Sequence, residues 1–225
     1  MELAYGARLF HRFWYGQPDD ANANAAWETG CAQVLEDAVS VMRRRQASLR
    51  GHTRLHEPSV DEPLVVVIID ELAALTAYCT DRDARRRIAA ALSLLLSQGR
   101  AVGITVIGAL QDPRKDVLPF RDLFPLRIAL RVTESEHVDM ILGSGARARG
   151  ARCDAIPECL PGVGYVVVDG IAEPIRVRFA HLTDTAIETV VTQATPTPAV
   201  EAPDVPLQVV DNQPPNLADD QQAAA

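Results

Sequence analysis

Two adjacent carboxylates, Asp70 and Glu71, are the residues of this chain best placed to do chemistry. They directly follow Leu64–Ile69, a short apolar run that is mostly β-branched. A run without polar alternation predicts a strand that is buried on both faces of a parallel sheet. The carboxyl edge of such a sheet is where open α/β folds bind ligands. There, Asp70 could hold a hydrated Mg²⁺ through water, and Glu71 could act as general base by polarising an attacking water.

This pattern is typical of a Walker B motif with a catalytic glutamate, but a matching Walker A motif is not present. A phosphate loop of the G-x-x-x-x-G-K-[ST] kind needs a lysine that follows glycine and reaches the phosphates. The single lysine, Lys115, lies between Arg114 and Asp116, without a preceding glycine or a following Ser or Thr. These 225 residues therefore contain no Walker A motif.

The composition predicts one folded domain and one tail. With 225 residues, 48% of them hydrophobic and 23% charged, the chain can build one ordinary core. We assign residues 1–193 to this domain. Residues 194–225 form an acidic tail rich in Pro, Ala and Gln, which we expect to be disordered because it offers little to bury. Most of the formal net charge of −8 lies in this tail, so the charge does not argue against a DNA-handling core.

No targeting signal is apparent, and this predicts a cytoplasmic location. The chain has neither a signal peptide nor an apolar run of the roughly 20 residues that a membrane span needs. Its cysteines form no C-x-x-C pair, which favours packed, reduced thiols over a zinc site. They are Cys31, Cys79, Cys153 and Cys159.

The pattern of the first half of the chain predicts a βαβ unit preceded by a helix. Helical spacing of apolar residues predicts a helix from about Trp27 to Arg50. A second helix should run from Asp81 or Asp83 to Gln98, with Gly99 as a left-handed cap. The strand that follows, 103–109, should lie parallel to 64–69, because strand–helix–strand crossovers are right-handed.

The second half adds smaller elements. We expect a strand over 126–132 and a short helix over 134–142 that ends at Gly143. Residues 165–168 and 175–179 flank Asp169-Gly170, which predicts a β-hairpin. A last helix should begin at Thr183 or Asp184 and end near Gln193. These elements together predict an α/β fold.

Four segments, taken in order, resemble the FtsK/SpoIIIE motor domain. The resemblance runs from about residue 1 to residue 190 and is closest to the branch found in high-GC bacteria and their conjugative elements. No single segment is decisive, but four in the same order are quite specific. They are Val66–Leu72, Gln98–Ile104 leading to Ala109–Pro113, Phe124–Ala129, and Leu160–Gly164.

The resemblance implies a RecA-like P-loop NTPase sheet and a hexameric, ATP-driven translocase of double-stranded DNA, active in conjugation or in chromosome segregation and cell division. Its cofactors would be ATP and Mg²⁺. In that family Asp70 would hold Mg²⁺ through water, Glu71 would be the general base, and Gln111 would be the nucleotide sensor. Arg127 and Arg100 fall on arginine positions of the family and are candidates either for an arginine finger or for structural ion pairs.

The resemblance also implies a gap. In sheets of this class the phosphate-loop strand lies between strand 103–109 and the next strand, 126–131. We expect this chain to begin downstream of it, so that the sheet is incomplete at its N-terminal, phosphate-loop side and carries a C-terminal β-hairpin. Tight binding of ATP by the chain alone is not expected.

Two functions stay open from the sequence. In the first, the chain is part of the DNA translocase, with double-stranded DNA and homologous subunits or a phosphate-loop-containing half as partners. Arg147, Arg149 and Arg152 are then candidates for DNA phosphate contacts, although a solvated loop explains them as well. In the second, the chain is a non-catalytic interaction module that docks on complete translocase subunits. An unrelated hydrolase is disfavoured, because no G-x-S-x-G motif or metal-ligand cluster accompanies the acids.

Overall fold

The computed structural model describes residues 2–15, 21–114, 117, 119–168 and 170–194. The predicted tail, 194–225, lies outside the described residues except for Ala194, and so does Asp169 of the predicted turn.

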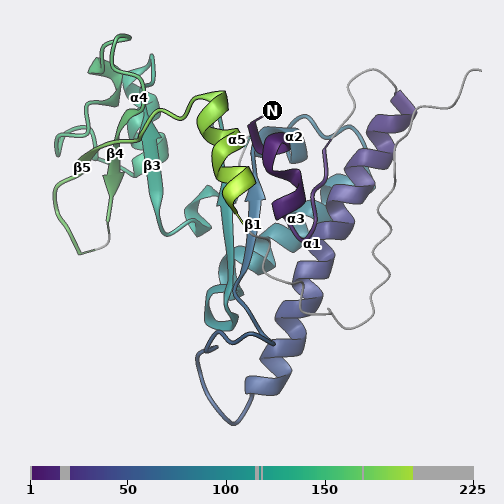
Figure 1. Ribbon diagram of the computed structural model, residues 1–225. Helices are drawn as coiled ribbons and strands as arrows, with labels where there is room; N and C mark the ends of the chain where they lie inside the picture. The colour runs from purple at the N-terminus through teal and green to yellow at the C-terminus, as the bar shows by residue number, and fades with distance from the viewer. Residues whose placement is uncertain (1, 16–20, 115–116, 118, 169, 195–225) are drawn as a thin grey trace, which may run out of the picture.

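The chain alternates helices with short strands in two groups (Figure 1). The helices and 3₁₀ turns (η) are η1 (Glu2–Leu9), α1 (Ala21–Leu49), α2 (Leu72–Leu75), α3 (Arg82–Gln98), η2 (Arg100–Val102), η3 (Arg121–Leu123), α4 (Ser135–Leu142), η4 (Cys153–Ala155) and α5 (Asp184–Gln193). The strands are β1 (Val65–Ile69), β2 (Ile104–Gly108), β3 (Arg127–Leu130), β4 (Val163–Val167) and β5 (Ile175–Arg178).

The first sheet consists of β1 and β2 in parallel, as the sequence predicted. Val65 pairs with Ile104 at one end of the register, and Ile69 pairs with Gly108 at the other. The crossover between the two strands contains α2, α3 and η2. Within the described residues, no strand pairs with the outer edge of β2.

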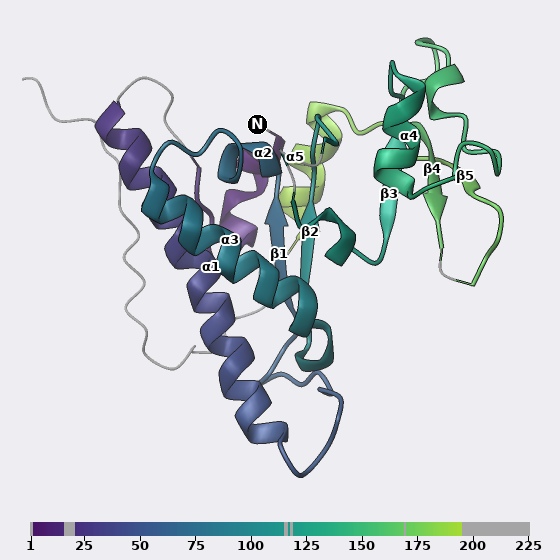
Figure 2. The same ribbon diagram turned by 180° about the vertical axis from the view of Figure 1, so that it is seen from behind.

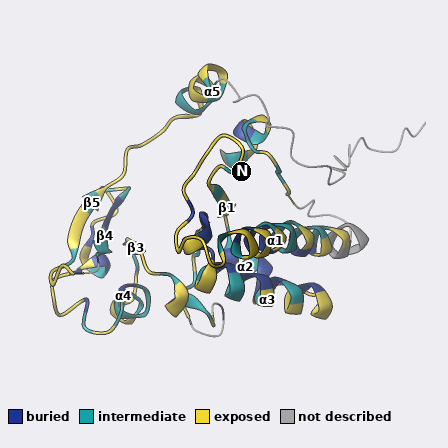
Figure 3. Cartoon of the chain, turned by 90° about the horizontal axis from the view of Figure 1, so that it is seen from below, coloured by how far each residue is buried: buried dark blue, intermediate teal, exposed yellow. Residues whose placement is uncertain are grey.

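Helices α1 and α3 lie side by side on one face of this sheet (Figures 2 and 3). The side chains of Val65, Val67 and Ile69 point toward them and pack into the larger core. Its fully buried members include Met42, Leu72, Ile88, Leu92, Leu95 and Ile104.

The opposite face of the β1/β2 sheet is open, so the prediction of a strand buried on both faces is wrong for this structure. Val66 is 51% exposed, Ile68 43% and Ile107 53%. Strand alternation places these three side chains on one face. Turn η1 and α5 pack on each other on this side of the sheet, yet they leave the three residues half exposed (Figures 1 and 3). We call Val66, Ile68 and Ile107 the open apolar face.

The second sheet is antiparallel, in the order β3-β4-β5. The predicted hairpin is confirmed, because β4 pairs with β5 from Val163↔Arg178 to Val166↔Ile175. Strand β3 pairs with β4 rather than with β2, so the two sheets do not close up on each other. Helix α4 covers one face of this sheet and forms a smaller core with it. That core includes Ala129, Val138, Leu142, Ala146, Ala151, Cys153 and Val163.

Most of the predicted helix ends are correct, but α1 begins at Ala21 rather than near Trp27, and the cap after α3 differs. Gly143 ends α4, and Thr183 caps α5 by accepting a hydrogen bond from the backbone N–H of Ala186. Gly99 is not a left-handed cap, because its φ of −64° is right-handed. The left-handed glycine is Gly103, with φ +72°, where a Cβ would also lie 2.3 Å from Cδ2 of His56. The reversal after α3 is therefore made in η2.

A buried arginine joins α1 to the beginning of both parallel strands. The guanidinium of Arg45, only 3% exposed, donates to the carbonyl oxygens of Val102 (2.9 Å) and Pro63 (2.6 Å). Pro63 and Val102 lie just before β1 and β2, respectively. Burial lowers the pKa of Arg45, while nearby Glu62 opposes the shift. The hydrogen bonds repay part of the desolvation cost and fix the strand starts against the helix.

A buried carboxylate anchors a second segment of the chain to the other end of α1. Glu28, 3% exposed, accepts hydrogen bonds from the backbone N–H groups of Thr80 and Asp81, each at 2.7 Å. Burial raises the pKa of Glu28, but these hydrogen bonds outweigh it and hold the pKa below its usual value. The segment that leads from α2 into α3 is thereby fixed to α1.

Substitution of Arg45 by alanine should destabilise the fold strongly. The carbonyl oxygens of Val102 and Pro63 would lose their donor inside the protein, and a cavity would remain. We expect a loss of about 3 kcal/mol in the free energy of unfolding, measured by urea denaturation. The exposed neighbour Arg44 is the matched control, and Arg44→Ala should change stability by less than about 0.5 kcal/mol. Equal effects of the two substitutions would contradict the role given to Arg45.

Candidate functional site

The acid pair lies at the carboxyl edge of the parallel sheet. Asp70 and Glu71 come directly after β1, and the backbone turns immediately into α2. The N–H of Leu72 donates to the carbonyl of Ala109 at 2.9 Å, and the N–H of Ala109 donates to the carbonyl of Ile69 at 2.8 Å. These bonds continue the strand ladder past Ile69, so both carboxylates stand on a fixed backbone.

Glu71 has a structural task that the sequence did not reveal. Its Oε1 accepts a hydrogen bond from the N–H of Ala73 at 2.9 Å, and this makes Glu71 the N-cap of α2. The side chain of Leu72 is buried against β2, where a Cβ on Gly108 would lie 2.4 Å from Cδ1 of Leu72. Glycine at 108 thus permits the close approach that sets the direction of α2.

Gln111 reaches the same edge from the neighbouring strand. Ile69 pairs with Gly108, so the residues after β1 and those after β2 leave the sheet side by side. Gln111 is exposed there, and Asp70 is exposed as well. The structure therefore gathers an exposed carboxylate, a helix-capping carboxylate and an amide at one edge. These are groups that can hold a hydrated cation, orient a water and contact a phosphate.

The two candidate arginines lie elsewhere. Arg100 is in η2, beside the start of β2, at the amino edge of the sheet and thus opposite the acids. Arg127 begins β3 in the second sheet, with Nη1 3.9 Å from Oδ1 of Asp122. Arg127 lines a shallow depression together with Arg121, whose Nη1 donates to the carbonyl of Pro113 at 2.9 Å. Nothing in the sequence had pointed to Arg121.

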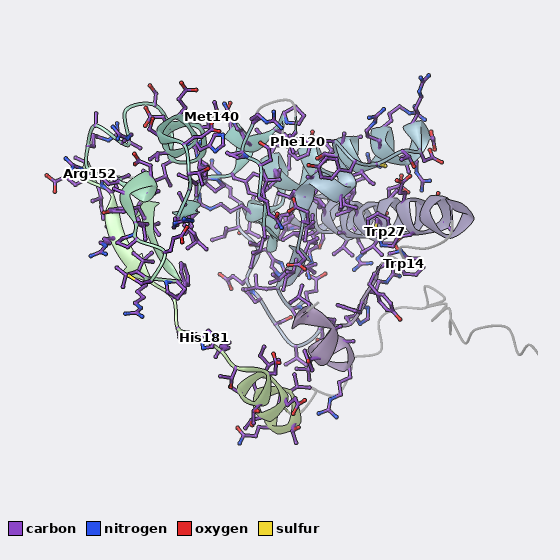
Figure 4. The ribbon with its side chains drawn as sticks, turned by 90° about the horizontal axis from the view of Figure 1, so that it is seen from above. Trp14, Trp27, Phe120, Met140, Arg152 and His181 are labelled. Carbon is purple, nitrogen blue, oxygen red and sulfur yellow. The ribbon has the colours of Figure 1, made fainter. Side chains whose placement is uncertain are left out.

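Figure 4 shows the surroundings of this depression. Phe120, which packs against the larger core, and Met140 of α4 lie on the two sides of the junction between the sheets. Arg100 thus lies at the opposite edge of the parallel sheet from the acid pair, and Arg127 lies in the second sheet.

The three arginines proposed to contact DNA share one loop, but they differ in their partners. Arg147 donates to Oδ2 of Asp154 through Nε (3.1 Å) and Nη2 (2.8 Å), and this pairing raises the pKa of Arg147. Arg149 donates to the carbonyl of Ser144 at 3.0 Å. Arg152 is exposed at the far end of the second sheet's group (Figure 4). Two of the three are therefore engaged in holding their own loop.

Other chemistries find little support among the described residues. No three of their His, Cys, Asp or Glu side chains come together to hold a metal ion. Burial raises the pKa of Cys31 to about 12 and that of Cys79 to about 11, so neither thiol is a ready nucleophile. Asp70 and Glu71 do supply oxygen donors of the kind Mg²⁺ takes beside substrate phosphates. None of the described helices is long and apolar enough to cross a membrane.

Comparison with known proteins shows what the whole chain is similar to. The chain is distantly homologous to the protein named DNA translocase FtsK. It is 32% identical to the one from Listeria monocytogenes over 180 aligned residues, which cover 71% of this chain and 22% of the relative. It is 31% identical to the one from Staphylococcus aureus strain Mu50 over the same length, covering 71% and 21%. The chain thus spans about a fifth of the length of these relatives. No family model matches it.

The fold is also similar to a solved structure of the pCW3 conjugation coupling protein TcpA, in its monomer form with ATPγS. The TM-score is 0.56 and the identity 22%, with 67% of this chain and 44% of that chain covered. The type VII secretion ATPase EccC of Thermomonospora curvata gives a TM-score of 0.49 at 18% identity, covering 75% of this chain and 21% of that one. The TcpA match shows that the two chains share a mixed α/β fold.

The double role of Glu71 can be separated by substitution. Glu71→Ala removes the cap of α2 and should lower the free energy of unfolding by about 1 kcal/mol. Glu71→Gln keeps an oxygen that can accept the hydrogen bond from Ala73, so its stability should stay within about 0.5 kcal/mol of the unchanged chain. Urea denaturation of both variants checks this. If the two variants lose equal stability, the capping bond does not hold α2.

Proposed function

We propose that this chain supplies the Walker B part of the motor domain of an ATP-driven translocase of double-stranded DNA. One observation carries the proposal: next to the acid pair, the parallel sheet has a strand edge that no described residue pairs with, and the open apolar face. A nucleotide site needs a phosphate loop, and the unpaired edge of β2 is where a phosphate-loop strand would join. That strand would come from another segment, of the same or of a second polypeptide.

The energetics favour such completion. Val66, Ile68 and Ile107 are each about half exposed, and burying the remainder of such side chains stabilises a complex by about 1 kcal/mol per residue. Pairing along β2 would also satisfy backbone groups for which the described part of the chain supplies no partner strand. Edges of this kind are ready templates for an added strand.

In the completed site, the residues of this chain would divide the work as follows. Asp70 would hold Mg²⁺ through water, and the bound ion would neutralise charge on the phosphates. Glu71 would orient the attacking water and take its proton onto the carboxylate. Gln111 would contact the terminal phosphate from the next strand and lose that hydrogen bond after hydrolysis.

The positions of the two candidate arginines support a proposed arrangement of several subunits. Arg100 and Arg127 stand away from the acid pair, so their proposed task is to donate to the nucleotide of an adjacent subunit, as an arginine finger does. A ring of homologous subunits, a hexamer in this class, would bring them there. Transfer of DNA in conjugation is one proposed setting, because the similar TcpA is named a conjugation coupling protein. Chromosome segregation in cell division, which the family resemblance implies, is the other.

The second candidate function is a non-catalytic module that docks on complete translocase subunits. The same open apolar face favours it, because this face would bind a partner whether or not a nucleotide site results. The two functions differ in one respect only: whether Asp70 and Glu71 take part in turnover.

Nucleotide binding tests the proposal directly. The purified chain alone should not bind a fluorescent ATP analogue in the presence of Mg²⁺, because it offers no phosphate loop. Mixed with a phosphate-loop fragment of an FtsK relative, it should bind the analogue and hydrolyse ATP. Glu71→Gln in the mixture should preserve binding and slow hydrolysis at least ~100-fold, since a general base contributes about that much.

Three outcomes decide between the functions. Turnover in the mixture that depends on Glu71 supports the motor. A stable complex without nucleotide binding supports the docking module and contradicts the motor. Hydrolysis by the chain alone that is lost in Glu71→Gln would show that no second segment is needed.

A further inference from the structure

A group of exposed arginines surrounds a hollow at the end of the molecule opposite the acid pair. The hollow lies where the end of α1 meets η2, and Gln46, Arg50, Arg54 and Ala101 are among its lining residues. Arg100 directly precedes Ala101. We call the arginines at positions 43, 50, 54 and 100 the basic hollow group; all four are exposed.

The helix geometry aligns these side chains. Arg43, Gln46 and Arg50 follow at i, i+3 and i+7, so they lie along one stripe of α1. The amide of Gln46 donates to Oε1 of Gln98 at 3.0 Å, and this joins the stripe to the end of α3, just before Arg100. The buried Arg45 also holds η2 in place through its hydrogen bond to the carbonyl of Val102. The hollow is thus built on fixed elements.

The charges of the basic hollow group are not compensated locally. Among the described residues, the side chains of Arg43, Arg50, Arg54 and Arg100 form no hydrogen bond or ion pair, whereas the side chain of Arg147 pairs with Asp154. The two segments that meet at the hollow, 38–56 and 84–110, contain no Asp or Glu at all. The C-terminal ends of α1 and α3 contribute only about half a negative charge each. Acids do follow shortly after in the chain, at Glu57, Asp61 and Glu62, and Glu62 acts on the buried Arg45. The four exposed arginines outnumber these acids, so the hollow carries a net positive charge.

The hollow is separate from the candidate nucleotide site. Val65 and Ile104 begin their strands at the hollow, whereas Asp70 and Gln111 lie beyond the other ends of the same strands. A strand of this length puts roughly 17 Å between the two edges. A polyanion bound here would leave the candidate ATP site free.

We propose that the basic hollow group binds the phosphodiester backbone of double-stranded DNA, without reading bases. The inference rests on the proposed function in taking DNA as the polyanion. Arginine contacts to phosphates position a duplex and give salt-dependent affinity. The hollow would then be the principal DNA contact of this chain, ahead of the loop that carries Arg147 and Arg149, whose guanidinium groups are engaged internally.

The test measures binding of a fluorescent 30-base-pair duplex of arbitrary sequence by anisotropy, with the full chain and at several salt concentrations. The triple variant Arg43→Ala/Arg50→Ala/Arg54→Ala should lose about tenfold or more in affinity near ~0.1 M salt. Its plot of log affinity against log salt should become shallower by about 2 to 3, as expected when three phosphate contacts are lost.

The matched control removes the same charge elsewhere. Arg82, Arg85 and Arg86 are exposed at the opposite end of α3, and their triple alanine variant should retain the duplex affinity and the salt slope of the unchanged chain. Circular dichroism of both triple variants checks that they fold. Equal losses in the two variants, an unchanged affinity in the hollow variant, or no binding by the unchanged chain would each overturn the proposal.

Two further experiments distinguish DNA binding at the hollow from binding of an acidic protein there, and from the proposed motor function. A poly-glutamate peptide of matched charge should displace the duplex only at far higher concentration; displacement at equal concentration would assign the hollow to an acidic protein instead. The hollow variant, mixed with the phosphate-loop fragment, should still bind the ATP analogue. If it does so while duplex binding is unaffected by the substitutions, the DNA inference fails and the proposed motor function stands.

Discussion

The parallel pairing of β1 with β2 is the constraint on which the rest of the structure depends. Its register sets Ile69 beside Gly108 and therefore delivers Asp70, Glu71 and Gln111 to one edge of the sheet. At the opposite edge the same register joins the strand starts to η2, where Arg45 holds the backbone from α1 and Arg100 stands exposed. One pair of strands thus separates a candidate nucleotide edge from a basic edge, and helices α1 and α3 support both from one face.

The sequence predicted the helices and strands correctly wherever a single local pattern determines the secondary structure. The apolar run before Asp70 predicted β1, and helical spacing predicted α1 and α3. What the sequence did not predict correctly was the environment of β1, that is, whether both of its faces are covered. The run is apolar on both faces, but the pattern is the same whichever segment covers the second face, so it could not show that Val66 and Ile68 stand half exposed here. That excess of exposed apolar surface is itself the strongest sign of an absent partner.

Several features that the sequence did not predict depend on contacts between residues that are distant in the chain. Nothing local marks Arg45 as the one buried member of three consecutive arginines, because its partners at Val102 and Pro63 are distant in the chain. Glu71 was correctly placed beside the sheet edge, yet its hydrogen bond to Ala73 depends on an abrupt turn into α2 that the Asp-Glu pair does not predict. The left-handed turn fell at Gly103 rather than Gly99 for a similar reason, since His56 packs against it.

The most direct test of the central proposal is backbone amide exchange in β2, followed by NMR before and after the phosphate-loop fragment is added. The N–H of Ala109 bonds to β1, so alternation turns the amides of Val106 and Gly108 toward the open edge and those of Thr105 and Ile107 toward β1. Addition of a strand predicts that Val106 and Gly108 become strongly protected, while Thr105 and Ile107, already paired, change far less. Complex formation that leaves Val106 and Gly108 as exchangeable as before would show that the edge of β2 is not completed, and would contradict the proposal.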